Sequence, residues 1–241
     1  MTQSPSVRVK DCFSARSRDI TPVAMCHTAQ VLYAPVYNNP EFTRTCASLL
    51  SEGEQRRSER FARAADRSLF LQRRAFRRFC GAQLLGNSQS LSQVEFVETE
   101  KGRPYLRELP NHWFSFSSWR GGYLGAWSAS HAIGVDIERR VPDPGATDLA
   151  RKYFSPAEAS LVQGPDGQAK VQAFFELWTL KEAALKSIGE GLPYGLHAFE
   201  FELDPDLRIV RIPPGHGGPE QFCVHLVPGA ENCTAIVLRC I

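Results

Sequence analysis

Ile133-Gly134-Val135-Asp136-Ile137-Glu138 is the stretch of this chain that decides its fold. Branched apolar residues alternate with small or acidic ones, which is the period of a β-strand with one buried face. The apolar residues would lie on the buried face, and Asp136 and Glu138 on the other. Two neighbouring carboxylates raise each other's pKa unless a cation lies between them. The pair is therefore either a Mg²⁺ site or a solvated strand face whose charge Arg139 and Arg140 neutralise.

About forty residues further on, residues 174–188 have the apolar pattern of a helix that Gly189 ends. Lys181 falls inside the apolar arc of this helix, so its ammonium either reaches solvent or finds a buried acceptor. Glu182 and Lys186 lie one turn apart on the edge of the arc. They form either an ordinary surface ion pair, or a third metal ligand and a phosphate contact in one cleft.

These two segments resemble the paired signatures of the 4′-phosphopantetheinyl transferases of the surfactin-synthetase type. The signatures are G-[VI]-D-[IL]-E and F-x-x-x-W-[ST]-x-K-E-[AS]-x-x-K-x-x-G-x-G-L, and the chain matches the second from Phe174 to Leu192. Residues 102–104 (GRP) and 114–117 (FSFS) are similar to the family's G-K-P and F-N-[LI]-S-H-S segments. Two motifs in the right order are more specific than either alone. The resemblance extends from about Arg56 to Leu196.

The resemblance implies an α+β fold in which two similar α+β halves form a pseudo-dimer. The N-terminal half would be residues 26–131, and residues 132–241 would form the C-terminal half with the metal site. Strand patterns at 113–117 and 123–128 precede the acidic strand, so we expect three consecutive strands in a meander. Residues 1–25 are rich in serine and basic residues and lack an apolar stretch, so we expect a disordered tail there.

Members of the family transfer the 4′-phosphopantetheine group from coenzyme A to a serine of a carrier protein and release adenosine 3′,5′-bisphosphate. The resemblance gives Asp136, Glu138 and Glu182 the role of ligands for Mg²⁺. Glu182 would also take the serine proton, directly or through a metal-bound water. Lys186 would contact the transferring phosphate as a charged donor.

The partner implied by the resemblance is an acidic, helical acyl or peptidyl carrier protein. We expect it to dock near Tyr153, Phe154 and residues 155–161, although a simple core role for these aromatic residues stays open. The sequence leaves open whether the carrier serves fatty-acid, polyketide or non-ribosomal peptide synthesis. A chain that holds both halves needs no second copy to complete its site, so we expect a monomer.

Basic residues are concentrated in residues 51–80, where nine arginines stand against four acidic residues. An excess of five positive charges on a helical hairpin favours an anionic partner. Arg103 replaces the lysine of G-K-P, which keeps the charge and changes its geometry. The resemblance assigns the following residues to coenzyme A: Arg57, Arg67, Arg103, Ser117, Ser118 and Lys186, with Arg73 or Arg74 as substitutes for Arg67. For any single arginine, a solvated helix face is the alternative.

One position departs from the family pattern. Ser118 stands where F-N-[LI]-S-H-S has the histidine that contacts the 3′-phosphate of coenzyme A, and Trp119 replaces the following serine. An unneutralised phosphate in a cleft would be costly. We therefore expect Arg120 or one of the helical arginines to take over that contact.

Composition restricts the remaining possibilities. The 241 residues are 43% hydrophobic, which is enough for a substantial core, and none of the apolar runs approaches a membrane span of about 18 residues. The seven cysteines show no C-x-x-C spacing, which argues against a zinc site and fits a reducing cytoplasm. No nucleic-acid-binding signature is present.

The sequence leaves three alternatives to a transferase. A non-catalytic protein could use the arginine-rich helices to bind phosphate or nucleic acid. A degenerate transferase could have lost its selectivity for coenzyme A with the change at Ser118. A metal-dependent nuclease would need an E-x-K partner after Asp136, which the sequence lacks.

Overall fold

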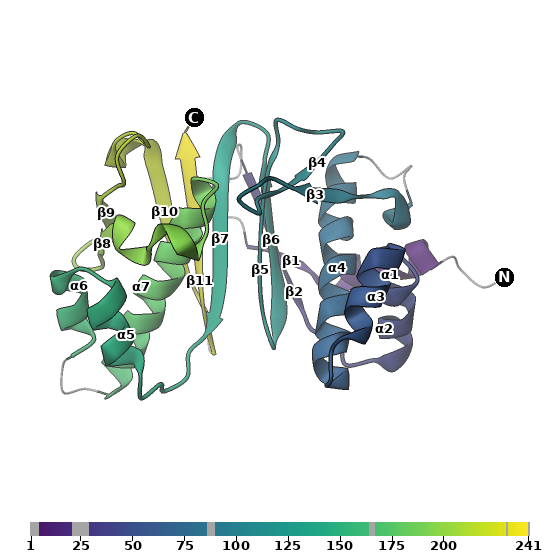
Figure 1. Ribbon diagram of the computed structural model, residues 1–241, viewed down its shortest axis with the longest axis horizontal. Helices are drawn as coiled ribbons and strands as arrows, with labels where there is room; N and C mark the ends of the chain where they lie inside the picture. Colours follow the sequence, from purple (N-terminus) through teal and green to yellow (C-terminus); the bar gives the residue numbers. More distant parts are fainter. Residues whose placement is uncertain (1–4, 21–28, 86–89, 164–166, 230, 241) are drawn as a thin grey trace.

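The structure, a computed structural model, describes residues 5–20, 29–85, 90–163, 167–229 and 231–240. The chain forms layers: helices α1 to α4, a first sheet, a second sheet, and helices α5 to α7 (Figure 1). The predicted α+β fold class is confirmed. Of the helices in the described ranges, none is both long and apolar enough to cross a membrane.

The N-terminal part of the chain builds a sheet in the strand order β1-β2-β6-β5, with α4 packed on its outer face. Phe70, Phe76 and Phe79 of α4 are buried against aromatic residues of this sheet such as Tyr123. The elements are α1 (Pro5–Arg16), β1 (Arg18–Asp19), β2 (Ala29–Pro35), α2 (Pro40–Ala47), α3 (Glu52–Glu59), α4 (Ala64–Leu85), β3 (Phe96–Glu98), β4 (Pro104–Leu106), β5 (Trp113–Trp119) and β6 (Gly122–Ser128).

The C-terminal part builds a second sheet, in the order β10-β11-β7, whose outer face α7 covers (Figure 1). Ser155 caps α6 and forms a capping box with Glu158. The elements are β7 (His131–Arg139), α5 (Ala146–Tyr153), α6 (Pro156–Leu161), α7 (Gly167–Ser187), β8 (Glu200–Glu202), β9 (Arg208–Arg211), β10 (Phe222–Pro228) and β11 (Asn232–Cys240).

The expected meander of three strands is wrong. β5 and β6 form an antiparallel hairpin, but β7 pairs with β11, with Asp136 opposite Ala235. β7 thus belongs to the second sheet, and the two sheets bury an apolar layer that includes Ile133, Val135 and Ile137. Pairing with β11 puts β7 in the sheet whose outer face α7 covers.

Residues 5–20 also differ from the expected disordered tail. They form α1 and β1, and β1 pairs with β2. Val9 and Phe13 lie one helical turn apart on α1 and are buried in the same cluster as α4. These two apolar residues suffice to dock an otherwise polar segment. Residues 1–4 and 21–25 of the predicted tail lie outside the described residues.

Lys181 of α7 finds buried acceptors. Its Nζ atom lies 2.8 Å from Glu158 of α6 and also donates to the carbonyl oxygens of Leu196 and Phe199. Burial lowers the pKa of Lys181, although the Glu158 carboxylate opposes that change. The two side chains are fully or almost fully buried, so this ion pair ties α6 and the chain after α7 to the helix that carries Glu182.

Candidate active site

β7 and α7 carry the acidic residues and lie in direct contact. Gly134 makes that contact possible, because a Cβ atom at this position would lie 1.8 Å from the carbonyl oxygen of Ala183. α7 therefore covers the face of β7 on which Asp136 lies, and Asp136 is only 2% exposed. Of the two alternatives for the acidic pair, a solvated strand face is therefore excluded for Asp136, and Glu138 is half-buried.

Asp136 uses one of its two carboxylate oxygens. Oδ1 accepts a hydrogen bond from the Ser117 hydroxyl of β5 at 2.7 Å and another from the Lys186 ammonium at 2.7 Å. Oδ2 is buried and has no hydrogen-bond partner among the described residues. A buried carboxylate oxygen without a partner is costly, so it needs a cation or donor that the chain itself does not supply.

The charge of Asp136 acts on the carboxyl groups of both Glu138 and Glu182. Burial raises the pKa of Glu138 to about 7, and repulsion from Asp136 and Glu182 adds to that rise. Burial followed by repulsion from Asp136 also raises the pKa of Glu182. The structure therefore brings the three predicted metal ligands into one electrostatic cluster. Among the described residues, however, no group of three or more acidic, histidine or cysteine side chains is arranged as a formed metal site.

Lys186 is the cation that this cluster contains. Besides Asp136, its Nζ atom contacts the Val135 carbonyl oxygen at 3.2 Å and a Glu182 carboxylate oxygen at 3.8 Å. Burial lowers the pKa of Lys186, but the attraction of Asp136 and Glu182 outweighs it and leaves the pKa above the ordinary value. The Glu182–Lys186 pair predicted from the sequence is therefore part of a larger network with Asp136.

Lys186 also lines a cavity of about 200 Å³. Its walls come from both parts of the chain: α4, the β3–β4 turn and β5 from one, and the end of α7 from the other. The lining residues with charge are Arg77, Lys101, Arg103, Lys186 and Glu190. Lys101 and Glu190 form an ion pair across the wall, which leaves an excess of positive charge facing the cavity.

The structure brings some of the predicted coenzyme A residues to the cavity and places the others elsewhere. Arg103 and Lys186 line the cavity, and Arg103 stacks on the Trp113 ring with its guanidinium carbon 4.1 Å from the centroid. Ser117 binds Asp136 instead. Arg57 lies over the Phe70 ring, and Arg67 is not among the residues that line the cavity.

Ser118 lines a different pocket, of about 310 Å³, together with Arg73 and Arg120. Arg120, the expected substitute for the family histidine, is three-quarters exposed and lies 3.7 Å from Asp66. Arg73 is more enclosed: burial, followed by repulsion from Arg74 and Arg57, lowers its pKa. Of the two routes expected from the sequence, a helical arginine thus has the better geometry.

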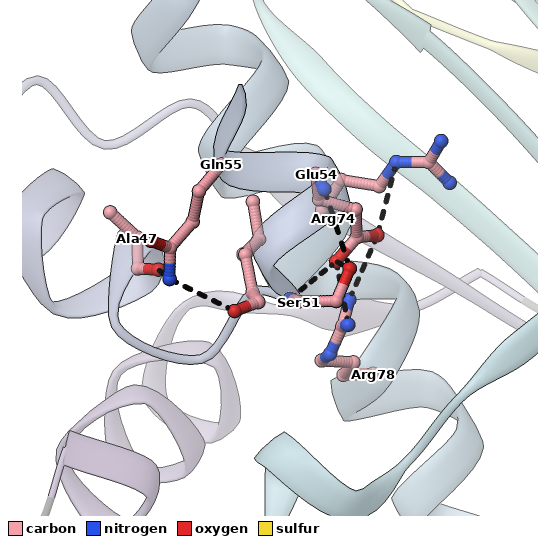
Figure 2. A network of polar contacts seen from close by, with 7 residues as sticks. Ala47, Ser51, Glu54, Gln55, Arg74 and Arg78 are labelled. Carbon is pink, nitrogen blue, oxygen red and sulfur yellow. Dashed lines mark hydrogen bonds and ion pairs between the residues drawn. The ribbon is translucent and has the colours of Figure 1, made fainter. Parts of the chain in front are cut away.

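Two further arginines of α4 hold the helices together. Glu54 of α3 binds Arg78 through both carboxylate oxygens, at 2.7 and 3.3 Å, and lies 3.4 Å from Arg74 (Figure 2). The same carboxylate accepts the Ser51 backbone N–H, which completes a capping box. Burial opposes ionisation of Glu54, but Arg78 outweighs it and lowers the pKa. Part of the basic excess of this hairpin is therefore structural.

Sequence reasoning did not single out Arg77 or the Lys101–Glu190 pair as parts of the cavity. Arg77 lies outside both motifs, and its only signal was membership in the arginine-rich stretch 51–80. Lys101 and Glu190 each neighbour a glycine of a recognised motif, Gly102 and Gly189, and that adjacency was the available signal.

Clustered carboxylates beside a cationic cavity are the groups that metal-dependent phosphoryl-transfer sites use. A sequence model described as the 4′-phosphopantetheinyl transferase superfamily matches residues 132–237. The relative slr0495 of Synechocystis sp. is 35% identical over 167 residues, which are 68% of this chain and 65% of the relative. The 4′-phosphopantetheinyl transferase HetI of Nostoc sp. is 30% identical over 194 residues, 79% of this chain and 78% of the relative.

The 4′-phosphopantetheinyl transferase Sfp of Bacillus subtilis is 30% identical over 130 residues, 52% of this chain and 55% of the relative. The chain spans 54 to 65% of the length of the first relatives that it matches. These matches show that the chain belongs to the 4′-phosphopantetheinyl transferase superfamily.

Proposed function

We propose that this protein transfers the 4′-phosphopantetheine group from coenzyme A to a serine of an acyl or peptidyl carrier protein, with Mg²⁺, and releases adenosine 3′,5′-bisphosphate. The observation that carries the proposal is the meeting of Asp136, Glu138 and Glu182 beside a cationic cavity, in a chain of this superfamily. The relatives Sfp and HetI are named 4′-phosphopantetheinyl transferases, and we propose the complete reaction for this chain.

The donor set fits Mg²⁺. The ion prefers carboxylate oxygens and keeps open positions for substrate phosphates. Asp136 Oδ2 is buried without a hydrogen-bond partner among the residues that the structure describes. Burial, followed by repulsion from Asp136, raises the pKa values of Glu138 and Glu182. Asp136, Glu138 and Glu182 would hold the ion. When bound, it would neutralise charge that develops on the leaving phosphate.

Glu182 is the proposed general base. It would accept the proton of the attacking serine hydroxyl. Lys186 lies 3.8 Å from this carboxylate and also lines the cavity, so its ammonium can donate a charge-assisted hydrogen bond to the transferring phosphate. Ser117 would keep the Asp136 carboxylate in its orientation through the 2.7 Å hydrogen bond.

The cavity between the two parts of the chain would receive the phosphates of coenzyme A. Arg103 lines it and takes the role of the family's G-K-P lysine. Arg57, Arg67, Ser118 and the neighbouring Arg73 stay candidates for the 3′-phosphate. The carrier is proposed to be an acidic helical domain docking beside Tyr153, Phe154 and α6. The protein would act as a monomer in the cytoplasm, on carriers of fatty-acid, polyketide or non-ribosomal peptide synthesis.

Intact-mass spectrometry of an apo carrier protein tests the proposal. The carrier is incubated with the full chain, coenzyme A and Mg²⁺, and in parallel with EDTA. A gain of one phosphopantetheine group per carrier, abolished by EDTA, is the expected result. Binding of RNA or phosphate by the chain, with every carrier tested left unmodified, would favour the non-catalytic alternative instead.

A further inference from the structure

Arg77 of α4 is a partly neutralised cation in the wall of the cavity. Its side chain is one-fifth exposed, and its guanidinium carbon lies 5.0 Å from the centroid of the Phe116 ring of β5. The residue lines the cavity together with Arg103 and Lys186. Arg77 therefore brings a third cationic group, from a third element of the chain, to the same space.

The neighbours of Arg77 explain why its charge is available. The nearest acidic atom is Glu98 Oε1, 3.7 Å from Nη1, which is beyond hydrogen-bond distance. Its Nε atom is buried without a hydrogen-bond partner among the described residues. One residue further along the helix, Arg78 reaches Glu54 at 2.7 Å through Nη2. Arg78 is thus held at hydrogen-bond distance by an acid of the protein, whereas Arg77 has the half-exposed Glu98 at 3.7 Å and a weaker attraction from Glu54.

The electrostatics of the helix point the same way. Burial, followed by repulsion from Arg74 and Arg73, lowers the pKa of Arg77 to about 10, so the guanidinium remains charged at neutral pH. Desolvating a charge beside two like charges is unfavourable unless an anion compensates for it. A multivalent anion in the cavity would compensate for Arg77, Arg103 and Lys186 at once.

We propose that Arg77 is a specificity-determining residue that binds a phosphate group of coenzyme A directly in the cavity, through its charged guanidinium fork. The inference rests on the proposed function. The guanidinium lies over the Phe116 ring in the cavity wall, and its Nη atoms would pair with phosphate oxygens in place of the 3.7 Å contact with Glu98. The ligand is either the 3′-phosphate or the pyrophosphate of the same molecule.

Calorimetric titration of the full chain with coenzyme A and with dephospho-coenzyme A tests this role. Arg77→Met should weaken coenzyme A binding at least about tenfold, the range for a lost charge-assisted hydrogen bond. Arg77→Lys should recover part of the loss. Arg56→Met is the matched control, because Arg56 is 62% exposed and pairs with Glu52, and it should change the affinity less than twofold.

The two ligands identify the phosphate. A loss confined to coenzyme A assigns Arg77 to the 3′-phosphate, and an equal loss for both ligands assigns it to the pyrophosphate. Glu98→Gln removes the competing acid and should tighten coenzyme A binding by about two- to fivefold, which keeps the proposal testable if Arg77→Met does not fold.

Unchanged affinity in folded Arg77→Met, or in both Arg77→Lys and Glu98→Gln, overturns the inference while the proposed function stands. If the unaltered chain binds neither ligand, the proposed function and the inference both fall.

Discussion

The ammonium of Lys186 lies 2.7 Å from Asp136 Oδ1, the oxygen that also accepts the Ser117 hydroxyl. In the metal-free protein, Lys186 thus supplies the positive charge closest to the three carboxylates. Because Lys186 also lines the cavity, it can pair with Asp136 or with an anion in the cavity. Occupation of the acidic cluster by Mg²⁺ and of the cavity by a phosphate would favour the second pairing.

Removing the Lys186 charge should separate the two roles. We expect Lys186→Met to bind Mg²⁺ several-fold more tightly in the absence of coenzyme A, because a competing cation is lost. The same variant should bind coenzyme A at least about tenfold more weakly, because a charged donor is lost. Calorimetric titration with each ligand gives both numbers. Parallel weakening of both affinities would argue against Lys186 as the internal counterion.

Glu138 should make the stability of the metal-free protein depend on pH. Its pKa is raised from 4.5 to about 7 in the folded chain, so the folded state holds a proton that the unfolded state releases. This contribution to stability is fully present below about pH 4.5 and is lost as pH rises through about 7. Unfolding by urea, with EDTA present, should show Glu138→Gln gaining about 2 kcal/mol on the unaltered chain between pH 5 and pH 8. A pH-independent difference would show that Glu138 is not buried as the structure has it.

The buried Lys181–Glu158 ion pair should contribute to the free energy of unfolding. Lys181→Met leaves the Glu158 carboxylate buried without its cation, which should lower the free energy of unfolding by about 3–5 kcal/mol. The double variant Lys181→Met/Glu158→Gln should recover a substantial part of that loss, because the unpaired charge is gone. Urea unfolding of the three variants, including Glu158→Gln alone, measures the coupling. Additive losses would mean that the two side chains do not interact in solution.

Gly134→Ala should disturb the site from a position that touches no ligand. The new methyl group would lie 1.8 Å from the Ala183 carbonyl oxygen, so α7 would have to move away from β7. We expect a loss of about 3 kcal/mol in unfolding free energy and a weaker Mg²⁺ affinity, because Glu182 moves with α7. Gly53→Ala, at an exposed position with open space around it, is the control. Wild-type Mg²⁺ affinity in Gly134→Ala would contradict the close helix–strand contact.

The sequence predicted those parts of the site that lie on single elements. Alternation around Asp136 and the helical spacing of Glu182 and Lys186 are local patterns, and both elements form as expected. The Lys186–Asp136 contact joins residues 50 positions apart, and it depends on how α7 lies on β7, which no local pattern contains. Arg77 was hidden for the same reason, since only the packed structure distinguishes it from Arg78, which Glu54 neutralises.

The two incorrect fold predictions, the three-strand meander and the disordered tail, both concern contacts between segments far apart in the sequence. β7 follows β6 closely, and short connections favour pairing between consecutive strands, yet β7 pairs with the much later β11. The pairing places β7 and β11 together under α7, which packs on both strands. The polar composition of residues 5–20 favoured the prediction of a disordered tail. Val9 and Phe13 are nevertheless buried, because they pack in the same cluster as α4, and that packing is not visible in the segment's own sequence.

Calorimetry of Mg²⁺ binding in the presence of coenzyme A, by the unaltered chain and by Asp136→Asn, tests whether the metal binds at Asp136. We expect a single Mg²⁺ ion bound per chain and at least about a tenfold weaker affinity in Asp136→Asn. Asp148→Asn, at an exposed position on α5, should retain the unaltered affinity. Equal Mg²⁺ affinity in Asp136→Asn and the unaltered chain would contradict the assignment of the metal to this cluster.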